Sequence, residues 1–460
     1  MSTRNGRDEG WSRSTERRSQ HPGPHPNRDL GNRSPYPRRL DDAHMSSVLS
    51  RALAEGILQS SDCAAVFYDL THLDSALCAL RDSFPSTALH AAAVKANPLI
   101  EVLKRIRAAG HGAEVASIGE LQLALAAGFA PSDIVFDSPV KTGGELSLAL
   151  ASGVMVSANS LAELARIGHI CSVENAAALV SVRINPEVGS GAISGTSVAV
   201  RRSKFGVSLL DCRSEIVRAF SEYPWLAGLH VHVGSQGMAS DQLLQGVGAV
   251  YDLCIESIGV SRLSFFNIGG GLPVKYHESD SPMCFDEYAH SLRKRCPALF
   301  TSDIRLVTEF GRSLHAGAGW VASRVEYVQD HPCGSPTVLT HVGADMFLRK
   351  AYRPDEWHHD MSVCDSAGHL RRGPPRTFDI AGPLCFAGDF LGRDVALPED
   401  LQEGDYLLIH DAGAYTFGMW SVYNSRFFPA ILGYEDEGVS FQHLRRRQTT
   451  SELVRFWSRG

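Results

Sequence analysis

Eight short, apolar segments rich in β-forming residues alternate with amphipathic segments between residues 85 and 315 of this 460-residue chain. Parallel strands need a crossover connection, usually a helix, so repeated strand-then-helix units predict a parallel sheet. Eight such units within one domain favour a closed (β/α)8 barrel over an open doubly wound sheet, which usually has fewer strands. The expected strands are 89–96, 113–118, 134–140, 154–158, 178–185, 227–234, 264–268 and 304–309.

Two of the intervening segments show the apolar spacing of a helix especially well. In residues 99–110 the apolar side chains recur about every 3.6 positions, and the segment ends at a glycine. Residues 119–128 have the same pattern and also end at a glycine. Glycine adopts the left-handed conformation that commonly ends a helix, so both segments are predicted to be helices that stop at these glycines.

The strand-helix alternation stops after about residue 315. Strand-like runs at 337–342, 377–381 and 406–410 then occur among turns rich in glycine and proline, which predicts a β-rich sandwich or barrel. A further run at 64–68 precedes the barrel and is expected to add a strand to this second domain. The predicted domains are an N-terminal segment at 46–84 that contributes to the β-rich domain, the barrel at 85–315, and the C-terminal β-rich domain at 316–460.

The first 45 residues have a different composition from the rest. They are rich in arginine, serine, proline, glycine and asparagine and contain few large apolar side chains, so they cannot bury enough surface to fold alone. We expect residues 1–45 to be a disordered tail. A transit peptide is the alternative interpretation, which the acidic residues among the arginines disfavour.

Composition excludes several classes of partner. The net charge of −7 gives no electrostatic reason to expect binding to nucleic acid or to an anionic membrane. No apolar run approaches the roughly 20 residues that span a bilayer, and the N-terminus lacks the apolar core of a signal peptide, so a cytoplasmic location is expected. Ten cysteines occur without CxxC pairs, which is typical of free thiols and indicates neither a disulfide framework nor a metal site.

Polar residues follow several of the predicted barrel strands. Barrel enzymes carry their chemistry on the loops at the carboxyl ends of the strands, so these residues are expected to share one rim. Each has an ordinary alternative: a lysine that reaches solvent, a core histidine, a tight glycine turn, or a structural ion pair. Their convergence favours a functional site. The residues are Lys95, His232, Ser235, Gly269, Gly270, Gly271, Glu309, Gly311 and Arg312.

These residue types suit the chemistry of pyridoxal phosphate. Lys95 ends an apolar run, where a partly desolvated amine can form a Schiff base with an aldehyde. The glycines, including Gly311, could let backbone N–H groups approach a phosphate, and the Ser235 hydroxyl could add a donor. Glu309 could keep the pyridine nitrogen protonated, so that the ring withdraws electrons more strongly.

The chain resembles the fold-type III pyridoxal-phosphate decarboxylases, the group that contains the diaminopimelate, ornithine, arginine and carboxynorspermidine decarboxylases. The resemblance covers roughly residues 60–435 and is closest to proteins described as diaminopimelate decarboxylase-like. It implies an alanine-racemase-like barrel with a C-terminal β-domain. The motifs that carry it are AVKAN at 93–97, GEL at 119–121, KFG at 204–206, HVGSQ at 232–236, GGG at 269–271, EFGR at 309–312, GPLC at 382–385 and DAGAY at 411–415.

The resemblance also implies roles for individual residues. Lys95 would hold the cofactor as a Schiff base, His232 would stack on its ring, and Tyr415 would reach its phosphate. Cys385 resembles the family's proton donor to the carbanion left after decarboxylation. The family is usually a homodimer with shared active sites, so Cys385 and Tyr415 would come from the second subunit.

The substrate is less constrained than the reaction, which is expected to be the decarboxylation of an amino acid. A specialised biosynthetic pathway is one expected setting for it. Phe386 follows Cys385 where an acidic residue usually contacts the substrate's distal amine, which weakens the case for a free distal ammonium. Arg312 and Arg349 are candidates to bind a distal carboxylate, with Tyr415 beside them; Arg349 could equally be a surface arginine. The alternatives are a decarboxylase of a carboxylated polyamine or conjugated amino acid, and a non-catalytic regulatory homologue.

Overall fold

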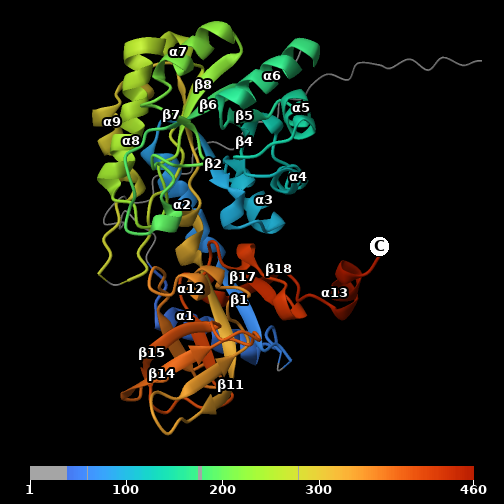
Figure 1. Cartoon of the computed structure of the whole chain (residues 1–460). Coiled ribbons are helices and arrows are strands. Elements are labelled where there is room, and N and C mark those ends of the chain that lie inside the picture. The colour runs from blue at the N-terminus through green and yellow to red at the C-terminus, as the bar shows by residue number, and fades with distance from the viewer. Residues whose placement is uncertain (1–38, 60, 175–178, 278, 460) are drawn as a thin grey trace, which may run out of the picture. The chain divides into compact units, whose positions relative to one another are not determined.

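The computed structural model describes residues 39–59, 61–174, 179–277 and 279–459. Most of the predicted tail, 1–45, therefore lies outside the described residues. Helix α1 (Asp42–Ala54) begins within the last part of that segment, where the Asp41 side chain accepts a hydrogen bond from the His44 N–H and caps the helix. The described chain forms a barrel and a second β-rich module (Figure 1).

The predicted barrel is confirmed: eight parallel strands follow the order β5-β4-β3-β2-β10-β9-β8-β6, and pairing of β5 with β6 closes the ring. A ninth, two-residue strand, β7 (Val207–Ser208), extends this sheet beside β6. The barrel strands are β2 (Leu89–Ala93), β3 (Gly112–Val115), β4 (Ile134–Asp137), β5 (Met155–Ala158), β6 (Val180–Asn185), β8 (Leu226–Val231), β9 (Phe265–Asn267) and β10 (Arg305–Thr308).

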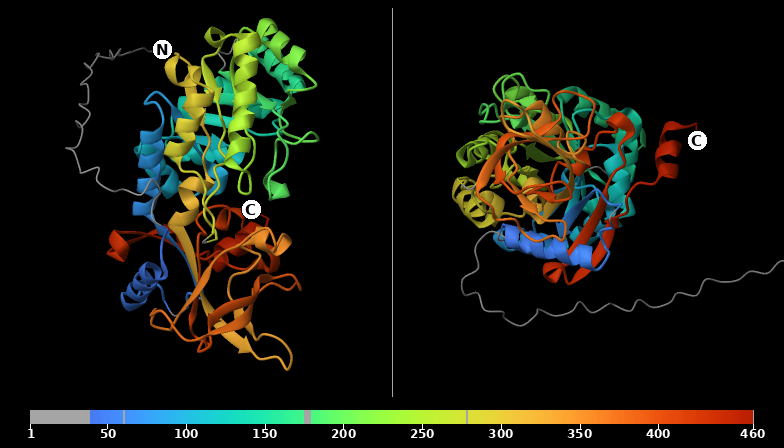
Figure 2. Two further views of the ribbon diagram at one scale, coloured as in Figure 1. Left: turned by 90° about the vertical axis from the view of Figure 1, so that its left-hand side faces the viewer. Right: turned by 90° about the horizontal axis from the view of Figure 1, so that it is seen from below.

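Helices cover the outside of the barrel (Figure 2). Their apolar faces pack on the strands, as the sequence periodicity predicts. The two predicted helices are observed at α3 and α4, and the glycines that follow them, Gly110 and Gly128, have φ of 84° and 87°. The helices are α2 (Leu70–Ser83), α3 (Ile100–Ala108), α4 (Ile118–Ala126), α5 (Gly143–Ala151), α6 (Leu161–Glu174), α7 (Arg213–Glu222), α8 (Ser240–Leu253) and α9 (Phe285–Arg295), with a short α10 (Ala298–Thr301).

The second module is a nine-stranded mixed sheet. Strand β1, from the N-terminal side of the barrel, lies inside it, antiparallel to β11 and parallel to β17. The sheet is therefore built from both ends of the described chain. Its strands are β1 (Ala64–Asp69), β11 (Gly319–Gln329), β12 (Thr337–Thr340), β13 (Met361–Cys364), β14 (Pro375–Ala381), β15 (Phe390–Pro398), β16 (Tyr406–Ile409), β17 (Ala430–Glu435) and β18 (Ser440–Arg445).

The core of this module is centred on Trp320, which is fully buried. Its ring stacks on Phe67 of β1 with centroids 4.2 Å apart, and its indole N–H donates to the Tyr434 hydroxyl at 3.1 Å. Helix α1 covers the same cluster with Met45 and Leu49. Trp320 thus joins β11 to its neighbour β1 and to β17, which lies on the other side of β1.

Three short segments bring the two modules together. Helix α11 (Arg312–His315) follows the last barrel strand, and α12 (Leu348–Tyr352) belongs to the β-rich module. The loop after β16 returns to the barrel, where the Tyr415 N–H donates to the Ala96 carbonyl at 3.0 Å. The carboxyl rim of the barrel therefore faces elements of the β-rich module.

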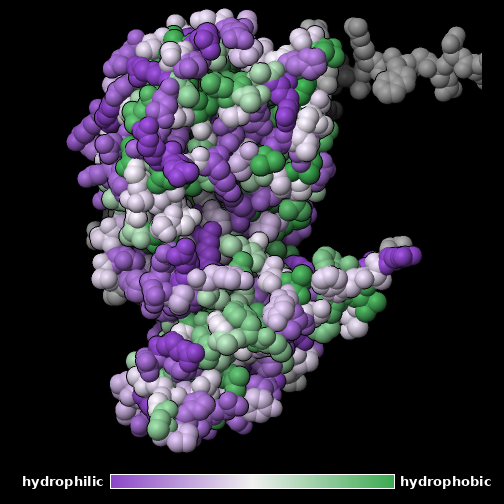
Figure 3. Space-filling model, in the orientation of Figure 1, coloured by the Kyte–Doolittle hydropathy of each residue, from purple (hydrophilic) through white to green (hydrophobic). Residues whose placement is uncertain are grey.

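The C-terminal helix α13 (Thr450–Trp457) buries none of its residues. Val454, Phe456 and Trp457 are exposed on it, and Figure 3 shows apolar surface on this projecting helix. Within the described ranges, no helix has the length and apolar character needed to cross a bilayer.

Replacing Trp320 with alanine should destabilise the β-rich module by about 3–5 kcal/mol, because the change leaves a large cavity and removes the partner of Tyr434. Trp457, which is 60% exposed in the chain, provides the matched control, and its replacement should change stability by less than about 0.5 kcal/mol. Urea unfolding followed by circular dichroism measures both. Equal effects of the two substitutions would contradict the central role assigned to Trp320.

Candidate active site

A pocket of about 350 Å³ lies at the carboxyl rim of the barrel. A larger hollow of about 750 Å³ beside Arg39 and His359 is lined by none of the residues predicted for the site. The predicted residues that line the rim pocket are Lys95, His232, Ser235, Gly271, Glu309, Gly311, Arg312, Arg349 and Tyr415. Gly269, Gly270, Cys385 and Phe386 are not among its lining residues.

Lys95 lies in a short 3-10 turn directly after β2, and its side chain is 39% exposed, toward the pocket. Its ammonium donates to both carboxylate oxygens of Glu114 at 2.5 Å. Burial lowers the pKa of Lys95, but the negative charges of Glu114 and Glu309 outweigh burial and raise it. In this state of the protein, Lys95 is a charged lysine held in place by Glu114.

Glu114 is a site residue that the sequence reasoning missed. It occupies the third position of the four-residue strand β3, and its side chain is fully buried. A carboxylate so placed needs a cationic partner, because isolated buried charges are very costly. The signal was present as one acidic residue within an otherwise apolar strand.

His232 is held by the glycine-rich loop that follows β9. The Gly270 N–H donates to His232 Nδ1 at 3.1 Å, so Nδ1 acts as an acceptor, and the Gly269 N–H donates to Asn267 Oδ1 at 2.9 Å. Burial lowers the pKa of His232 to about 3, which makes its ring neutral near pH 7. Two of the three loop N–H groups therefore fix the loop and the histidine, and only Gly271 of the triplet reaches the pocket wall.

Glycine is required in this loop by close backbone contacts. A Cβ on Gly270 would lie 2.2 Å from the Glu309 carbonyl oxygen, and one on Gly271 would lie 2.1 Å from that of Gly234. Gly271 also has φ of 104°, which side chains rarely tolerate. The triplet thus lets the loop after β9 pack against the ends of its neighbouring strands.

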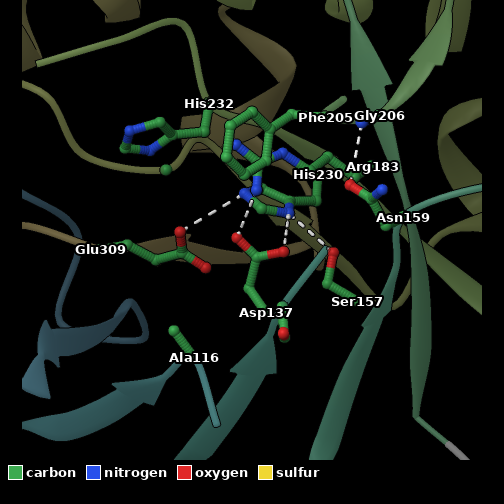
Figure 4. Close-up of polar contacts among 12 residues, drawn as sticks. Ala116, Asp137, Ser157, Asn159, Arg183, Phe205, Gly206, His230, His232 and Glu309 are labelled. Atoms are coloured by element: carbon green, nitrogen blue, oxygen red, sulfur yellow. Dashed lines mark hydrogen bonds and ion pairs between the residues drawn. The ribbon is translucent and has the colours of Figure 1, made fainter. Parts of the chain in front are cut away.

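Glu309 follows β10 and is almost fully buried. The Asn267 amide donates to its Oε1 at 2.6 Å, while its Oε2 lies 3.4 Å from His230 Nε2 (Figure 4). Burial raises the pKa of Glu309, but the charge and hydrogen bond of His230 outweigh burial, and the pKa is lowered. Glu309 is therefore held as a carboxylate at the pocket wall.

Three further ionisable residues that sequence reasoning missed lie beside Glu309: Asp137, Arg183 and His230. Arg183 donates to Asp137 Oδ2 at 2.7 Å, and His230 Nδ1 lies 3.8 Å from Asp137 Oδ1 (Figure 4). Asp137, His230 and Glu309 have the composition of a metal site. However, His230 turns opposite ring nitrogens to the two carboxylates, an arrangement that bridges them rather than offering all three groups to one ion.

Arg312 and Arg349 form a second, cationic wall. The centre of each guanidinium lies 4.9 Å from the Trp357 ring centroid and 4.7 Å and 4.6 Å, respectively, from that of Tyr415. Neither arginine forms an ion pair with a carboxylate within the described part of the chain, and a buried nitrogen of each lacks a hydrogen-bond partner there. Burial, followed by the charge of Arg312, lowers the pKa of Arg349 to about 10. This wall could bind an anion.

The expectation that a second subunit supplies Tyr415 is wrong. Tyr415 lines the pocket of its own chain, and its backbone is hydrogen-bonded to Ala96, the residue after Lys95. The loop after β16 crosses back to the barrel because β16 pairs with β11, the strand that follows the barrel rim. This short route places Tyr415 over the pocket within one chain.

Cys385 and Phe386 lie on an exposed loop between β14 and β15. The Cys385 N–H donates to Asn424 Oδ1 at 2.7 Å, and the Tyr423 hydroxyl donates to the Cys385 carbonyl at 3.1 Å. These contacts fix the loop without bringing its thiol to the pocket of the same chain.

Comparisons with known proteins agree with this architecture. Residues 70–316 match the family model of the pyridoxal-dependent decarboxylase, pyridoxal binding domain. Diaminopimelate decarboxylase of Pseudomonas aeruginosa is 33% identical over 84% of this chain and 90% of its own length. The probable chloroplastic diaminopimelate decarboxylase of Oryza sativa subsp. japonica is 32% identical over 79% of this chain and 73% of its own length.

A solved structure extends the similarity to three dimensions. The crystal structure of diaminopimelate decarboxylase from Helicobacter pylori complexed with L-lysine superposes with a TM-score of 0.78 and 28% identity, covering 88% of this chain and 98% of that one. With the family model and the relatives, this likeness identifies the chain as a member of the fold-type III pyridoxal-phosphate decarboxylases, that is, a pyridoxal-phosphate-dependent carboxy-lyase.

Proposed function

We propose that Lys95 holds pyridoxal phosphate in the rim pocket and that the enzyme decarboxylates an α-amino acid whose side chain ends in a carboxylate. The observation that carries the proposal is the division of charge along the pocket. Lys95, His232 and Glu309 lie at its barrel end, and the uncompensated Arg312 and Arg349 lie on another wall.

The residues present fit the cofactor. The family's chemistry needs an amine, a ring support, a partner for the pyridine nitrogen and donors for a phosphate. Lys95, His232 and Glu309 supply the first three, while Ser235, Gly271 and Arg312 supply donors on the same pocket. The Arg312 Nε lies 3.5 Å from the Ser235 hydroxyl, so these two groups can share one anion.

When bound, the cofactor supplies an electron sink for the bonding pair that remains when carbon dioxide leaves. The chain's own residues prepare the site for that event. Glu114 binds the Lys95 amine and fixes it at the pocket, where it can be joined to the cofactor aldehyde. His232, neutral and fixed by Gly270, presents its ring without adding a positive charge. Glu309 holds a negative charge at the pocket wall.

The distal end of the substrate is assigned to Arg349, with Arg312 and Tyr415 beside it. An anion there would satisfy the buried Arg349 nitrogen that lacks a partner, and a planar guanidinium binds a carboxylate with two parallel hydrogen bonds. Diaminopimelate, named in the relatives, carries such a carboxylate. Phe386 favours a second candidate, an acidic conjugated amino acid or carboxylated polyamine in which the distal amine is not free.

We also propose a homodimer with shared active sites in a reducing cytoplasm. The exposed position of Cys385, away from the pocket of its own chain, supports delivery of this thiol to the pocket of a second copy. As proton donor, Cys385 would protonate the substrate carbon after decarboxylation. The ten cysteines, all within the described residues, form no disulfides, which suits a reducing compartment.

Replacement of Lys95 with alanine should abolish the visible absorption band of the bound cofactor and reduce decarboxylation by about a thousandfold or more, because the attachment point is lost. Lys104, an exposed lysine on α3, provides the control, and its replacement with alanine should change neither quantity. Absorption spectra and carbon dioxide release measure the effects. A wild-type protein that stays colourless with added pyridoxal phosphate would instead favour the non-catalytic homologue.

Substrate preference tests the assignment of Arg349. Assays of diaminopimelate, acidic amino-acid conjugates, carboxynorspermidine, lysine and ornithine should show the highest kcat/KM for a substrate with a distal carboxylate. Arg349→Gln should raise KM for that substrate about 10–100-fold, because a bidentate contact is lost. Arg353→Gln, at an exposed arginine just after α12, should leave KM unchanged. A preference for lysine or ornithine, or release of a racemised amino acid without carbon dioxide, would refute the proposal.

Shared active sites can be tested by combining one impaired and one inactive chain. Cys385→Ala should slow decarboxylation and favour side products, and Lys95→Ala should be inactive. Co-expression of the two variants should restore about a quarter of wild-type activity, because half of the dimers are mixed and each mixed dimer has one intact site. Cys333→Ala, at another exposed cysteine, should be fully active alone. Absence of restoration would place Cys385 outside the partner's pocket.

A further inference from the structure

His230 is a buried, ionisable residue to which the proposed function assigns no role. It lies on β8, two residues before His232, and its side chain is fully buried. Nε2 lies 3.4 Å from Glu309 Oε2, and Nδ1 lies 2.7 Å from the Ser157 hydroxyl and 3.8 Å from Asp137 Oδ1. One imidazole thus lies between two carboxylates that both line the rim pocket, those of Glu309 and Asp137.

The charges around His230 explain why such a bridge is needed. Glu309 has one neutral donor, the Asn267 amide, at Oε1, which leaves Oε2 turned toward His230. A buried carboxylate without a cationic partner is driven toward its neutral, protonated form. Lys95 is a nearby cation, but its ammonium is bound to Glu114. His230 Nε2 is therefore the group placed to face the second oxygen of Glu309.

The far side of His230 faces a second carboxylate, that of Asp137. Asp137 accepts a hydrogen bond from Arg183, which holds the carboxylate with Oδ1 on the side of His230. Arg183 is in turn packed over the Phe205 ring, 4.7 Å from its centroid, on the pocket wall. Arg183, Asp137, His230 and Glu309 thus form one series in which each side chain faces the next.

We infer that His230 is a positioning residue that keeps Glu309 ionised and oriented toward the cofactor ring, with Asp137 and Arg183 as its support. The inference rests on the proposed function, in which Glu309 faces the pyridine nitrogen. His230 itself lies behind Glu309 and is not among the residues that line the pocket. It acts on the reaction only through the charge of Glu309.

The experiment measures the protonation of the cofactor ring rather than activity alone. Pyridoxal phosphate labelled with nitrogen-15 in the pyridine ring is bound to wild-type holoenzyme and to four variants: His230→Asn, His230→Gln, Glu309→Gln and His90→Asn. His90 is the matched control, a buried barrel histidine that bonds Thr308 instead of Glu309. The His230→Gln side chain can still donate a hydrogen bond but carries no charge. Melting curves report whether each variant is folded.

The nitrogen-15 resonance of the wild type and of His90→Asn should indicate a protonated ring. Glu309→Gln and both His230 variants should move it in the same direction, toward the unprotonated form. In the His230 variants kcat should fall about 10–100-fold, as for other supporting residues, while KM changes little. A larger shift for asparagine than for glutamine would assign part of the effect to the hydrogen bond.

The outcomes distinguish failure of the proposed function from failure of the inference about His230. If Glu309→Gln leaves the resonance unchanged, or the wild type binds no labelled cofactor, the proposed function of the pocket fails. If Glu309→Gln moves the resonance but folded His230→Asn and His230→Gln do not, the inference about His230 is overturned while the proposed function stands. If the nitrogen-15 resonance moves as far in His90→Asn as in His230→Asn, the effect arises from general loosening of the barrel. That result would also overturn the inference about His230.

Discussion

The burial of charge at the carboxyl end of the barrel is the constraint on which the site depends. Removing an ion from water costs several kcal/mol even after relaxation, so each buried charge needs a partner in good geometry. Glu114 is satisfied by Lys95, and Asp137 by Arg183. Lys95 follows β2 and Glu114 lies in the adjacent β3, while Asp137 and Arg183 lie in β4 and β6, the two strands that flank β5. These ion pairs therefore form only when those strands are paired in the register of the barrel.

The sequence predicted the strands and the rim residues for the same physical reason. A buried parallel strand is apolar along its length, so its end is visible as the point where polar residues begin, as at Lys95 and Glu309. Glu114 and Arg183 lie within strands, where a single charge interrupts an apolar run. Periodicity shows that such a residue is unusual, but its partner is defined only by the order and register of the strands.

The loops of the β-rich module were harder to predict because their position depends on pairings between distant segments. Tyr415 and Cys385 lie at comparable distances along the chain from Lys95, and nothing local distinguishes them. Pairing of β16 with β11 returns the Tyr415 loop to its own barrel. The Cys385 loop instead follows β14, which pairs with β12 and β15, and it is fixed by Asn424 on an exposed face. The different positions of the Tyr415 and Cys385 loops therefore follow from the strand pairing of the sheet, which no local sequence motif reveals.

The acidic residues at the barrel end of the pocket have cationic partners, but the two arginines on the second wall have no anionic partners among the described residues. This difference bears on which substrate the pocket can bind. The acidic residues at the barrel end are engaged by cations of the same chain, whereas Arg312 and Arg349 rest on the faces of Trp357 and Tyr415. Aromatic faces stabilise a guanidinium only partly, so the lowered pKa of Arg349 reflects a remaining electrostatic cost. A bound anion would remove that cost, and a distal ammonium would increase it. Recognition is therefore expected to depend on negative charge at the variable end of the substrate, whether or not a second amine is present.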